Sequence, residues 1–394
     1  MTLQPLFSYF GILLALVVPA LAIGLVCKQR LAHAWIAVAT VVMIVIQYWE
    51  LRSIAHAPSH PFWVVFGLIV AQWCIARVLV ALRGYTQRQS VLYGAVLVAA
   101  APALIVMFEF VVTGQRIGIG FLGLYIITFR ALDVLFSIGD NFITRLSFTE
   151  YISFIAFFPT IGHGPIDRYP RFHADWERNR THSELFNDVR DGVHRIFRGL
   201  LYAFIIAPLI QQYWLPHAAA SMDLVHIASF MYAYAFYLFF VFAGYSSFSI
   251  GTGYLFGIHM PENFNSPFLA RNIRDYWNRW NISLTWWFRD HLYSRFVHAA
   301  IKGAWFRDDR IASYIGYTIV MVLMGFIRDV TWTIFFSSLY FALLLIGYDI
   351  FRRWNKKHNI FKVWSRAPYA LSIFLTFNAI SFGLLLFSGH LSST

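Results

Sequence analysis

An all-α, polytopic membrane protein is the fold class that the sequence predicts, on three observations. Of the 394 residues, 59% are hydrophobic and only 13% are charged, whereas a soluble domain carries about 25% charged residues. Repeated apolar runs reach the roughly 20 residues that a helix needs to cross a bilayer. No Gly/Ser-rich linker or low-complexity tract divides the chain. We therefore expect one membrane domain over residues 1–394, with N-terminal helices at 1–140.

The predicted spans follow one another along the whole chain. The run at 224–257 is too long for one upright crossing, so we expect it to tilt or to break at Gly244, Gly251 or Gly253. The first run should be a retained helix, because no basic segment precedes it and no Ala-x-Ala site ends it. The expected spans are 6–26, 33–49, 61–83, 91–112, 117–138, 193–215, 224–257, 311–327, 332–350 and 368–390.

The formal net charge of +12 is attributed to cytoplasmic loops that face anionic lipid. The chain has no basic tail and no nucleic-acid motif, so we expect no nucleic-acid partner. Lys28 and Arg30 follow the first run and place the N-terminus outside. The basic connector at 352–366 should be cytoplasmic. Cys27 and Cys74 match no metal or disulfide spacing, and we expect no metal site.

One polar, tryptophan-rich stretch, NSPFLARNIRDYWNRWNISLTWWFRDHLYSRF at 265–296, lies between apolar runs. At helical spacing, one stripe is aromatic and a neighbouring stripe is polar. The polar stripe holds Arg274, Asn278, Asn281 and Thr285. Such a helix either lies at the membrane interface or dips beside a polar cavity. The aromatic stripe is Trp277, Trp280, Leu284, Trp287 and His291.

Two further features place polar groups or irregular backbone at membrane depth. Arg130 and Asp133 interrupt an apolar run three residues apart, and either pair with each other or face a cavity. The stretch FIAFFPTIGHGPIDRYPRF at 154–172 contains three prolines and two glycines, which forbid a continuous helix. It is either a re-entrant hairpin that lines a cavity or an interfacial loop.

With FFPTIGHGPIDRYPRF followed by NIRDYWNRWNISLTWWFRDHLYSRF, the chain resembles the membrane-bound O-acyltransferase (MBOAT) family. The resemblance is strongest to the D-alanyl-transfer, or DltB-like, branch, and it continues through LMGFIRDVTWTIFFSSLYFALLLIGYDIFRRWNKKHN. It covers the chain from about residue 150 onward, so 146–394 is expected to be the family core. The resemblance implies a ring of about ten or more tilted helices, with re-entrant or interfacial helices, around a central tunnel.

The resemblance also implies a reaction and a set of partners in the cell membrane. A DltC-like acyl carrier protein would bring a D-alanyl-type group as a phosphopantetheine thioester, with no cofactor bound to the chain itself. The acyl group would cross the membrane to a hydroxyl of a teichoic acid in the cell envelope. Other membrane proteins of envelope modification are further possible partners. On the same resemblance, Val297, Ile301 and Trp305 would dock the carrier, and the tunnel-lining residues would be Trp277, Trp280, Arg279, Arg289, Asp290 and Arg168.

The chain departs from the family pattern at its two reactive positions. WNRWNIS places Asn281 where DltB-like members have His and many relatives have Asn, and GFIRD places Arg328 where the family has its presumed basic His. Asn cannot exchange protons near neutral pH, and Arg stays protonated. Arg328 could instead stabilise an oxyanion or bind phosphate. Asp329, His163 and His291 are the remaining candidates for a base.

Three interpretations remain open from the sequence. The chain is an active acyltransferase with relocated chemistry, through His291, His163 or Asp329. Otherwise it is a relative that has lost catalysis and keeps a binding or scaffolding role, or an enzyme trapped by deliberate substitution. A second enzymatic alternative is O-acetylation of a polysaccharide, although GPIDRY and LLLIGYDIFRRWNKKH favour the DltB-like branch.

Overall fold

The computed structural model describes residues 15–23, 29–55, 61–113, 123–161, 164–328, 330–358 and 366–392. These residues form helices and connecting segments, with a single isolated bridge between Phe264 and Trp280 in place of strands. They group into two compact units. Unit 1 is 1–199 with 245–261, and unit 2 is 200–244 with 262–394. The first predicted span, at 6–26, lies largely outside the described residues, as do Lys28, His163 and Asp329.

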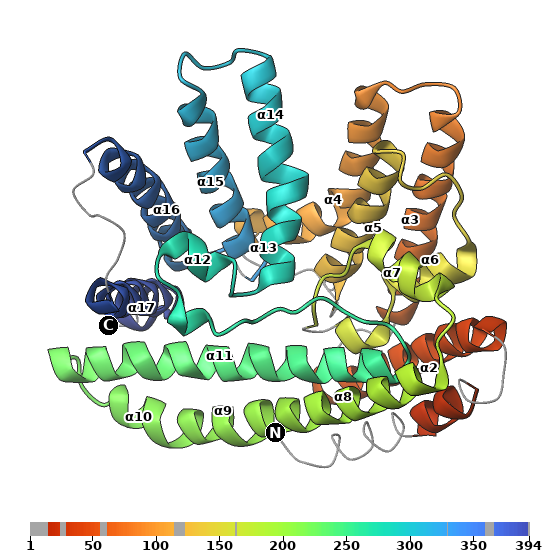
Figure 1. The fold of residues 1–394 in the computed structure, drawn as a ribbon, viewed down its shortest axis with the longest axis horizontal. Coiled ribbons are helices and arrows are strands. Elements are labelled where there is room, and N and C mark those ends of the chain that lie inside the picture. The colour runs from red at the N-terminus through yellow and green to blue at the C-terminus, as the bar shows by residue number, and fades with distance from the viewer. Residues whose placement is uncertain are drawn as a thin grey trace. The chain divides into compact units, whose positions relative to one another are not determined.

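Unit 1 is built on three long helices that pack side by side, α3 (Pro61–Arg83), α4 (Gln89–Thr113) and α5 (Leu124–Gly139) (Figure 1). The helix α2 (Gln29–Ala55) packs against α6 (Phe148–Ile155) and the short turn η1 (Phe158–Thr160), and α7 (Tyr169–Glu177) packs against α5 and α6. The stretch at 154–172 is thus broken into short elements, as its prolines and glycines predict. The fourteen residues of α5 from Leu124 to Gly139 that are buried make it the centre of this unit.

Arg130 and Asp133 on α5 do not pair with each other, which corrects one of the two sequence interpretations. The Arg130 guanidinium is fully buried and donates to the carbonyl oxygens of Phe154 (3.0 Å) and Ile155 (3.2 Å) and to Thr160. Asp133 instead accepts from Arg168 Nη1 (2.8 Å) and from the Tyr169 backbone N–H (2.8 Å). The carbonyls at the end of α6 lack helical partners, so the arginine caps that helix and the aspartate holds the start of α7.

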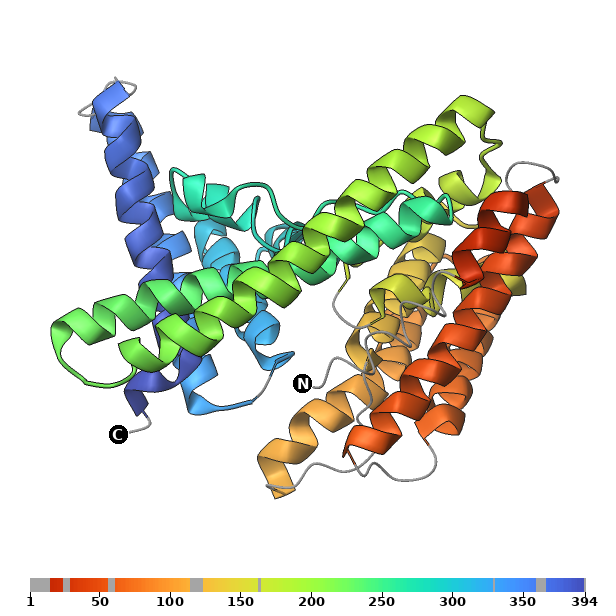
Figure 2. The same ribbon diagram turned by 90° about the horizontal axis from the view of Figure 1, so that it is seen from below.

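Two long helical segments, residues 182–218 and 224–255, each contribute residues to both units. In unit 1, α8 (His182–Leu200) packs on the C-terminal part of α11 (Leu224–Leu255), where Gly192 and Gly251 let the two backbones approach closely (Figure 2). In unit 2, π-helical turns η2 (Leu201–Ile206) and η3 (Ile210–Trp214), with α9 (Ala207–Leu209) and α10 (Leu215–Ala218), continue α8. There Gly244 of α11 lies against Ala203.

The predicted break in the long apolar run is therefore wrong, because α11 is one continuous helix. Its glycines do not interrupt the helix. A Cβ at Gly251 would lie 2.6 Å from the Gly192 carbonyl oxygen, and a Cβ at Gly244 would lie 2.7 Å from the Ala203 backbone nitrogen. These glycines are required by close helix packing, as small residues are in membrane helices generally.

The rest of unit 2 is built around a helical hairpin of α15 (Asp309–Phe326) and α16 (Trp332–His358), with α17 (Arg366–Ser388) packed on α16. The helices α12 (Ile273–Trp277), α13 (Ile282–Phe288) and α14 (Ser294–Lys302) lead into it. The π-helical turn η5 (Arg289–Tyr293) joins α13 to α14, and both η5 and α14 pack on α15 (Figure 1). The 3₁₀ turns are η4 (Pro267–Leu269) and η6 (His390–Ser392).

Among the described residues, six helices are long and apolar enough to cross a bilayer. They correspond to the predicted runs at 61–83, 91–112, 193–215, 224–257, 332–350 and 368–390. Shorter helices occupy three further predicted runs: α5 has 16 residues, α15 has 18, and His33–Ile46 is a short apolar stretch within α2. The polytopic, all-helical class is confirmed.

Candidate functional site

The tryptophan-rich stretch at 265–296 is not one continuous helix, so that prediction is wrong. Residues 263–265 lie alongside residues 279–282 and take their backbone hydrogen bonds. The Asn265 N–H donates to the Arg279 carbonyl (3.0 Å), and the Ile282 N–H donates to the Asn263 carbonyl (3.0 Å). This pairing ends α12 at Trp277, and α13 begins at Ile282 after four intervening residues. The reason is a contact made outside the helical pattern, which residue spacing within the stretch cannot reveal.

Asn281 lies at the break, in the left-handed backbone region with φ 45° and ψ 51°. Its side chain is half-buried and makes no capping hydrogen bond, while its carbonyl accepts from the Thr285 N–H (3.0 Å). The Asn263 side chain fixes the following turn, because its Oδ1 accepts from the Ser283 N–H (3.2 Å) and Oγ (2.5 Å). Asn and His are both among the residues enriched in this backbone region. An asparagine at this position therefore has a backbone reason as well as a chemical one.

The free energy of unfolding of variants at position 281 should depend on how easily the new residue adopts the left-handed backbone conformation. Val at this φ is expected to lower the free energy of unfolding by about 1–2 kcal/mol, because Cβ crowds the following carbonyl. Gly, which adopts this conformation freely, is expected to stay close to Asn. Thermal unfolding of the purified protein in detergent, followed by tryptophan fluorescence, measures the difference. Equal losses for Asn281→Gly and Asn281→Val would show that the side chain, and not the backbone, stabilises the turn.

Aromatic rings surround the residue next to Asn281. Trp280 is buried, stacks on Tyr276 (5.6 Å between ring centroids) and contacts Phe264 at 5.1 Å and Phe239 of α11 at 6.3 Å. Trp277 lies edge-on to Phe341 of α16 at 5.4 Å. Both predicted lining tryptophans are therefore packed among aromatic rings of unit 2. Their rings hold the break between α12 and α13 against α11 and α16.

The predicted polar lining residues take local partners. Arg279 donates to Asp275 (2.8 Å) and to the Asn265 carbonyl (3.3 Å), so it supports the turn that carries Asn281. Arg289 and Asp290 are exposed and pair with each other at 2.8 Å, with the guanidinium 5.2 Å from the Trp286 ring. These contacts leave their assignment to a tunnel a prediction.

The predicted carrier-docking residues lie on and after α14. Val297 is half-buried and faces Gly316 of α15, whereas Ile301 and Trp305 are 45% and 58% exposed. Trp305 lies edge-on to Phe296 at 6.1 Å. The end of α14 thus presents two large apolar side chains on an otherwise polar and basic segment, with Lys302 between them in sequence.

Arg328 follows the end of α15 and is exposed. Its guanidinium lies 4.5 Å from the centre of the Phe387 ring of α17, and its Nη2 donates to the Tyr234 hydroxyl of α11 at 3.4 Å. Tyr234 stacks on Phe230, which stacks in turn on His390. Arg328 is therefore held by aromatic side chains from two other helices.

Asn281 and Arg328, the two residues that depart from the family motif, both lie close to α11. Within the described part of the chain, no hydrogen bond or ion pair joins them. Trp280, next to Asn281, contacts Phe239, and Arg328 contacts Tyr234. These α11 residues are five positions apart, which is about 7.5 Å along the helix axis and about 140° around it. The two segments thus approach different faces of α11 within two turns.

Arg168, the remaining predicted lining residue, lies in unit 1 and forms an ion pair with Asp133 (2.8 Å). Beside it in sequence, Arg171 pairs with Asp167 and also with Asp175 (3.1 Å). Burial raises the pKa of the Asp167 carboxyl, while Arg171 opposes that rise. These contacts tie the loop before α7 to α5 and to α7 itself.

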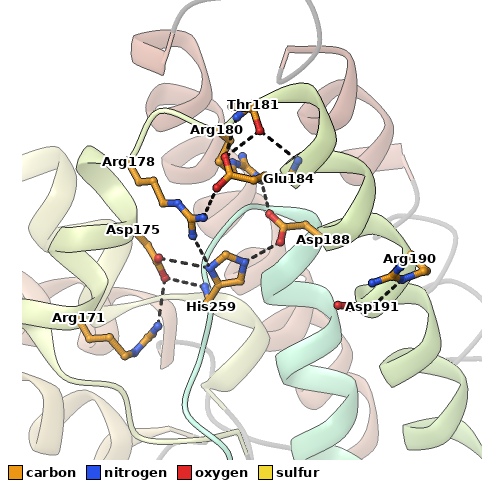
Figure 3. Close-up of polar contacts among 10 residues, drawn as sticks. All are labelled: Arg171, Asp175, Arg178, Arg180, Thr181, Glu184, Asp188, Arg190, Asp191 and His259. Atoms are coloured by element: carbon orange, nitrogen blue, oxygen red, sulfur yellow. Dashed lines mark hydrogen bonds and ion pairs between the residues drawn. The ribbon is translucent and has the colours of Figure 1, made fainter.

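An ionic cluster centred on His259 escaped the sequence analysis (Figure 3). The His259 Nε2 lies 2.7 Å from Asp188 Oδ1, its Nδ1 lies 3.4 Å from Asp175 Oδ1, and its backbone N–H donates to Asp175 Oδ2 at 2.7 Å. Arg178 lies between His259 and Glu184. The residues come from three separate segments, so no local spacing could have indicated them.

Stability of unit 1 should depend on pH through His259. Hydrogen bonds to Asp175 and Asp188 raise the pKa of the imidazole to about 9, against about 6.5 in an unfolded chain. A raised pKa stabilises the fold fully below pH 6.5, and this contribution is lost as pH rises to 9. The expected loss is roughly 2 kcal/mol after allowance for solvent screening. Unfolding curves of wild type and His259→Gln between pH 6 and 10 should converge at alkaline pH, and parallel curves would contradict this.

Comparison with known proteins assigns the chain to a family. Residues 73–391 match the membrane-bound O-acyltransferase family. A teichoic acid D-alanyltransferase of Bacillus subtilis is 39% identical over 277 residues, 69% of each protein. One of Streptococcus thermophilus is 31% identical over 404 aligned positions, 98% of this chain and 94% of the relative. A probable alginate O-acetylase AlgI of Azotobacter vinelandii is 30% identical over 57% of this chain and 43% of the relative.

The match takes in both motif segments, the α15–α16 hairpin and most of unit 1, and it agrees with the polytopic, all-helical fold. The resemblance drawn from the sequence motifs is confirmed. The chain is a multi-pass membrane protein that belongs to the membrane-bound O-acyltransferase family.

Proposed function

We propose that the chain is a membrane acyltransferase of the teichoic acid D-alanylation type. It takes a D-alanyl group from a carrier-protein thioester on the cytoplasmic side and passes it to a hydroxyl of an envelope polymer. The observation that carries the proposal is the similarity to a teichoic acid D-alanyltransferase over 98% of the chain. Similarity to alginate O-acetylases covers a smaller share, 57% of the chain for the Azotobacter protein.

The chemical step is an exchange of a thioester for an ester. The acceptor hydroxyl oxygen attacks the thioester carbonyl carbon, the C–O bond forms and the C–S bond breaks. The thiol of the phosphopantetheine arm leaves with a proton, and the proton of the hydroxyl must be taken up by a base. Arg328 cannot take it, because a guanidinium stays protonated. His163, Asp329 and His291 are the proposed bases if the chain turns over.

A second candidate function is binding of the carrier or the polymer without turnover. It is favoured by one observation, the exposed Arg328 held against Phe387 at the position of the family's presumed base. Membranes that contain the chain, supplied with carrier protein loaded with labelled D-alanine, separate the two functions. Label in the polymer above that of membranes lacking the chain supports acyl transfer. Background label with intact carrier binding supports the binding function.

The carrier should dock on the exposed end of α14. Ile301→Asp is expected to reduce capture of the loaded carrier by about tenfold or more, because a charge replaces a large apolar side chain at an interface centre. Ala299→Asp is the matched control, since this exposed residue lies two positions away on the other side of the same helix. Equal capture by both variants would remove Ile301 from the docking surface, and equal loss would point to non-specific charge repulsion.

A further inference from the structure

Arg328 in unit 2 has no role in the acyl-transfer step proposed for the chain, because its guanidinium cannot accept a proton. It is an exposed cation, and in the described part of the chain no carboxylate pairs with it. Several other arginines of this unit have an aspartate partner within 4.0 Å. They are Arg274, Arg279, Arg289, Arg310 and Arg353. Arg328 instead contacts an aromatic face and a phenol.

The contacts of Arg328 hold the guanidinium without using up its donors. The group carries five N–H donors in a planar fork, and one of them reaches the Tyr234 oxygen at 3.4 Å. The Phe387 ring lies against the guanidinium at 4.5 Å and adds a cation–π attraction. Tyr234 accepts from Arg328 in this contact, so its own O–H proton remains available to a second acceptor. Two neighbouring groups can therefore donate to one anion.

The position of Arg328 in the hairpin favours the outer side of the membrane. The last turn of α16 carries Lys356, Lys357 and His358, and a basic helix end is retained in the cytoplasm. Arg328 lies at the opposite end of the hairpin, between the end of α15 and the start of α16. The helix α17 packs on α16 and begins after the basic end of α16. Phe387 lies near the last residue of α17, at the end away from these basic residues.

We propose that Arg328, with the Tyr234 hydroxyl beside it, binds a phosphodiester oxygen pair at the outer side of the membrane. A guanidinium fork matches the two free oxygens of a phosphodiester, as a bidentate pair. The inference rests on the proposed function for its preferred source, a polymer of polyol units joined by phosphodiesters. A phospholipid headgroup carries the same chemistry and is the other source. In this proposal Arg328 orients the acceptor polymer, whereas it cannot act as the base that takes the proton of the hydroxyl.

Binding measurements on purified protein test this subsite without any acyl transfer. The probes are a water-soluble poly(glycerol phosphate) oligomer, added to protein in a non-ionic detergent, and phosphatidylglycerol, added to protein in phosphatidylcholine nanodiscs. Arg328→Ala is expected to weaken one of the two by about tenfold, and the probe that responds identifies the source. Arg328→Lys should weaken it nearly as much, because the charge is kept and the fork is lost.

Arg271 provides a matched control, since its exposed guanidinium lies 4.1 Å from the Tyr369 ring at the beginning of α17. Arg271→Ala removes the same type of cation–π contact and should leave both affinities unchanged. Unchanged affinity of Arg328→Ala for both probes would overturn the phosphodiester subsite, as would full retention of affinity by Arg328→Lys.

The outcome also separates this inference from the proposed function. Loss of binding in Arg328→Ala, together with background transfer by wild-type protein, would support the subsite and reject acyl transfer. If wild-type protein transfers the acyl group and Arg328→Ala binds both probes as tightly as wild type, acyl transfer is supported and the subsite is rejected.

Discussion

Replacement of Arg328 by histidine is expected to raise the rate constant of D-alanyl transfer by about two to three orders of magnitude. A positioned general base contributes about 10²–10⁴ in rate, and the chain has a permanently protonated group where the family has its presumed base. Single-turnover transfer from loaded carrier protein, in membranes with matched amounts of wild-type and variant protein, measures the change. Because the half-buried Asn281 side chain can orient a substrate by hydrogen bonding, Asn281→His should add little by itself.

The same substitution should move binding in the opposite direction. Histidine lacks the planar fork that Arg328 offers a phosphodiester, so the acceptor concentration for half-maximal rate should rise while the maximal rate rises. If Arg328→His raises the transfer rate without changing the acceptor concentration for half-maximal rate, histidine acts as the base but the phosphodiester subsite is contradicted. Wild-type transfer that is already fast, unchanged by Arg328→His and abolished by His163→Ala, would show that the base has moved to residue 163.

The sequence predicted what depends on composition and on long, specific motifs. Apolar runs located α3, α4, α11 and α17 to within two residues at each end, because a bilayer imposes one length and one polarity on every spanning helix. The run at 332–350 located the start of α16 but not its end, because the helix continues through polar residues to His358. The two motif segments identified the family that the match over 73–391 confirms. The residues at positions 281 and 328 could be picked out because the surrounding motif fixed which types belong there.

Contacts between distant segments explain what the sequence could not predict. The left-handed turn at Asn281 is set by Asn263, which binds Ser283 and is eighteen residues away from Asn281. The aspartates that bind His259 are seventy-one and eighty-four residues from it. Helical periodicity within 265–296 predicted one continuous helix. A periodic pattern carries no information about a segment outside it, and residues 263–265, which pair with 279–282, interrupt the helix.

Arg130 is where removal of one side chain should cost most stability. Arg130→Met keeps much of the volume but leaves the Phe154 and Ile155 carbonyls and Thr160 without their buried donor. An unsatisfied buried acceptor costs about 1–3 kcal/mol, and the Phe154 carbonyl keeps a long hydrogen bond from the Phe157 N–H (3.5 Å). The expected loss in the free energy of unfolding is therefore about 3–5 kcal/mol. Thermal unfolding in detergent measures it, with Arg145→Met, an exposed arginine of the same unit, as the control.

A milder variant keeps this prediction testable if Arg130→Met fails to fold. Thr160→Val removes one of the three acceptors and leaves the guanidinium on the two carbonyls, so a loss of about 1 kcal/mol is expected. Arg130→Lys should fall between the two, because an ammonium has the charge but cannot reach three acceptors in a plane. Losses below about 1 kcal/mol for Arg130→Met, like those of a surface arginine, would mean that α6 and its following turn are held by packing alone. The buried charge on α5 would then have to be explained by function.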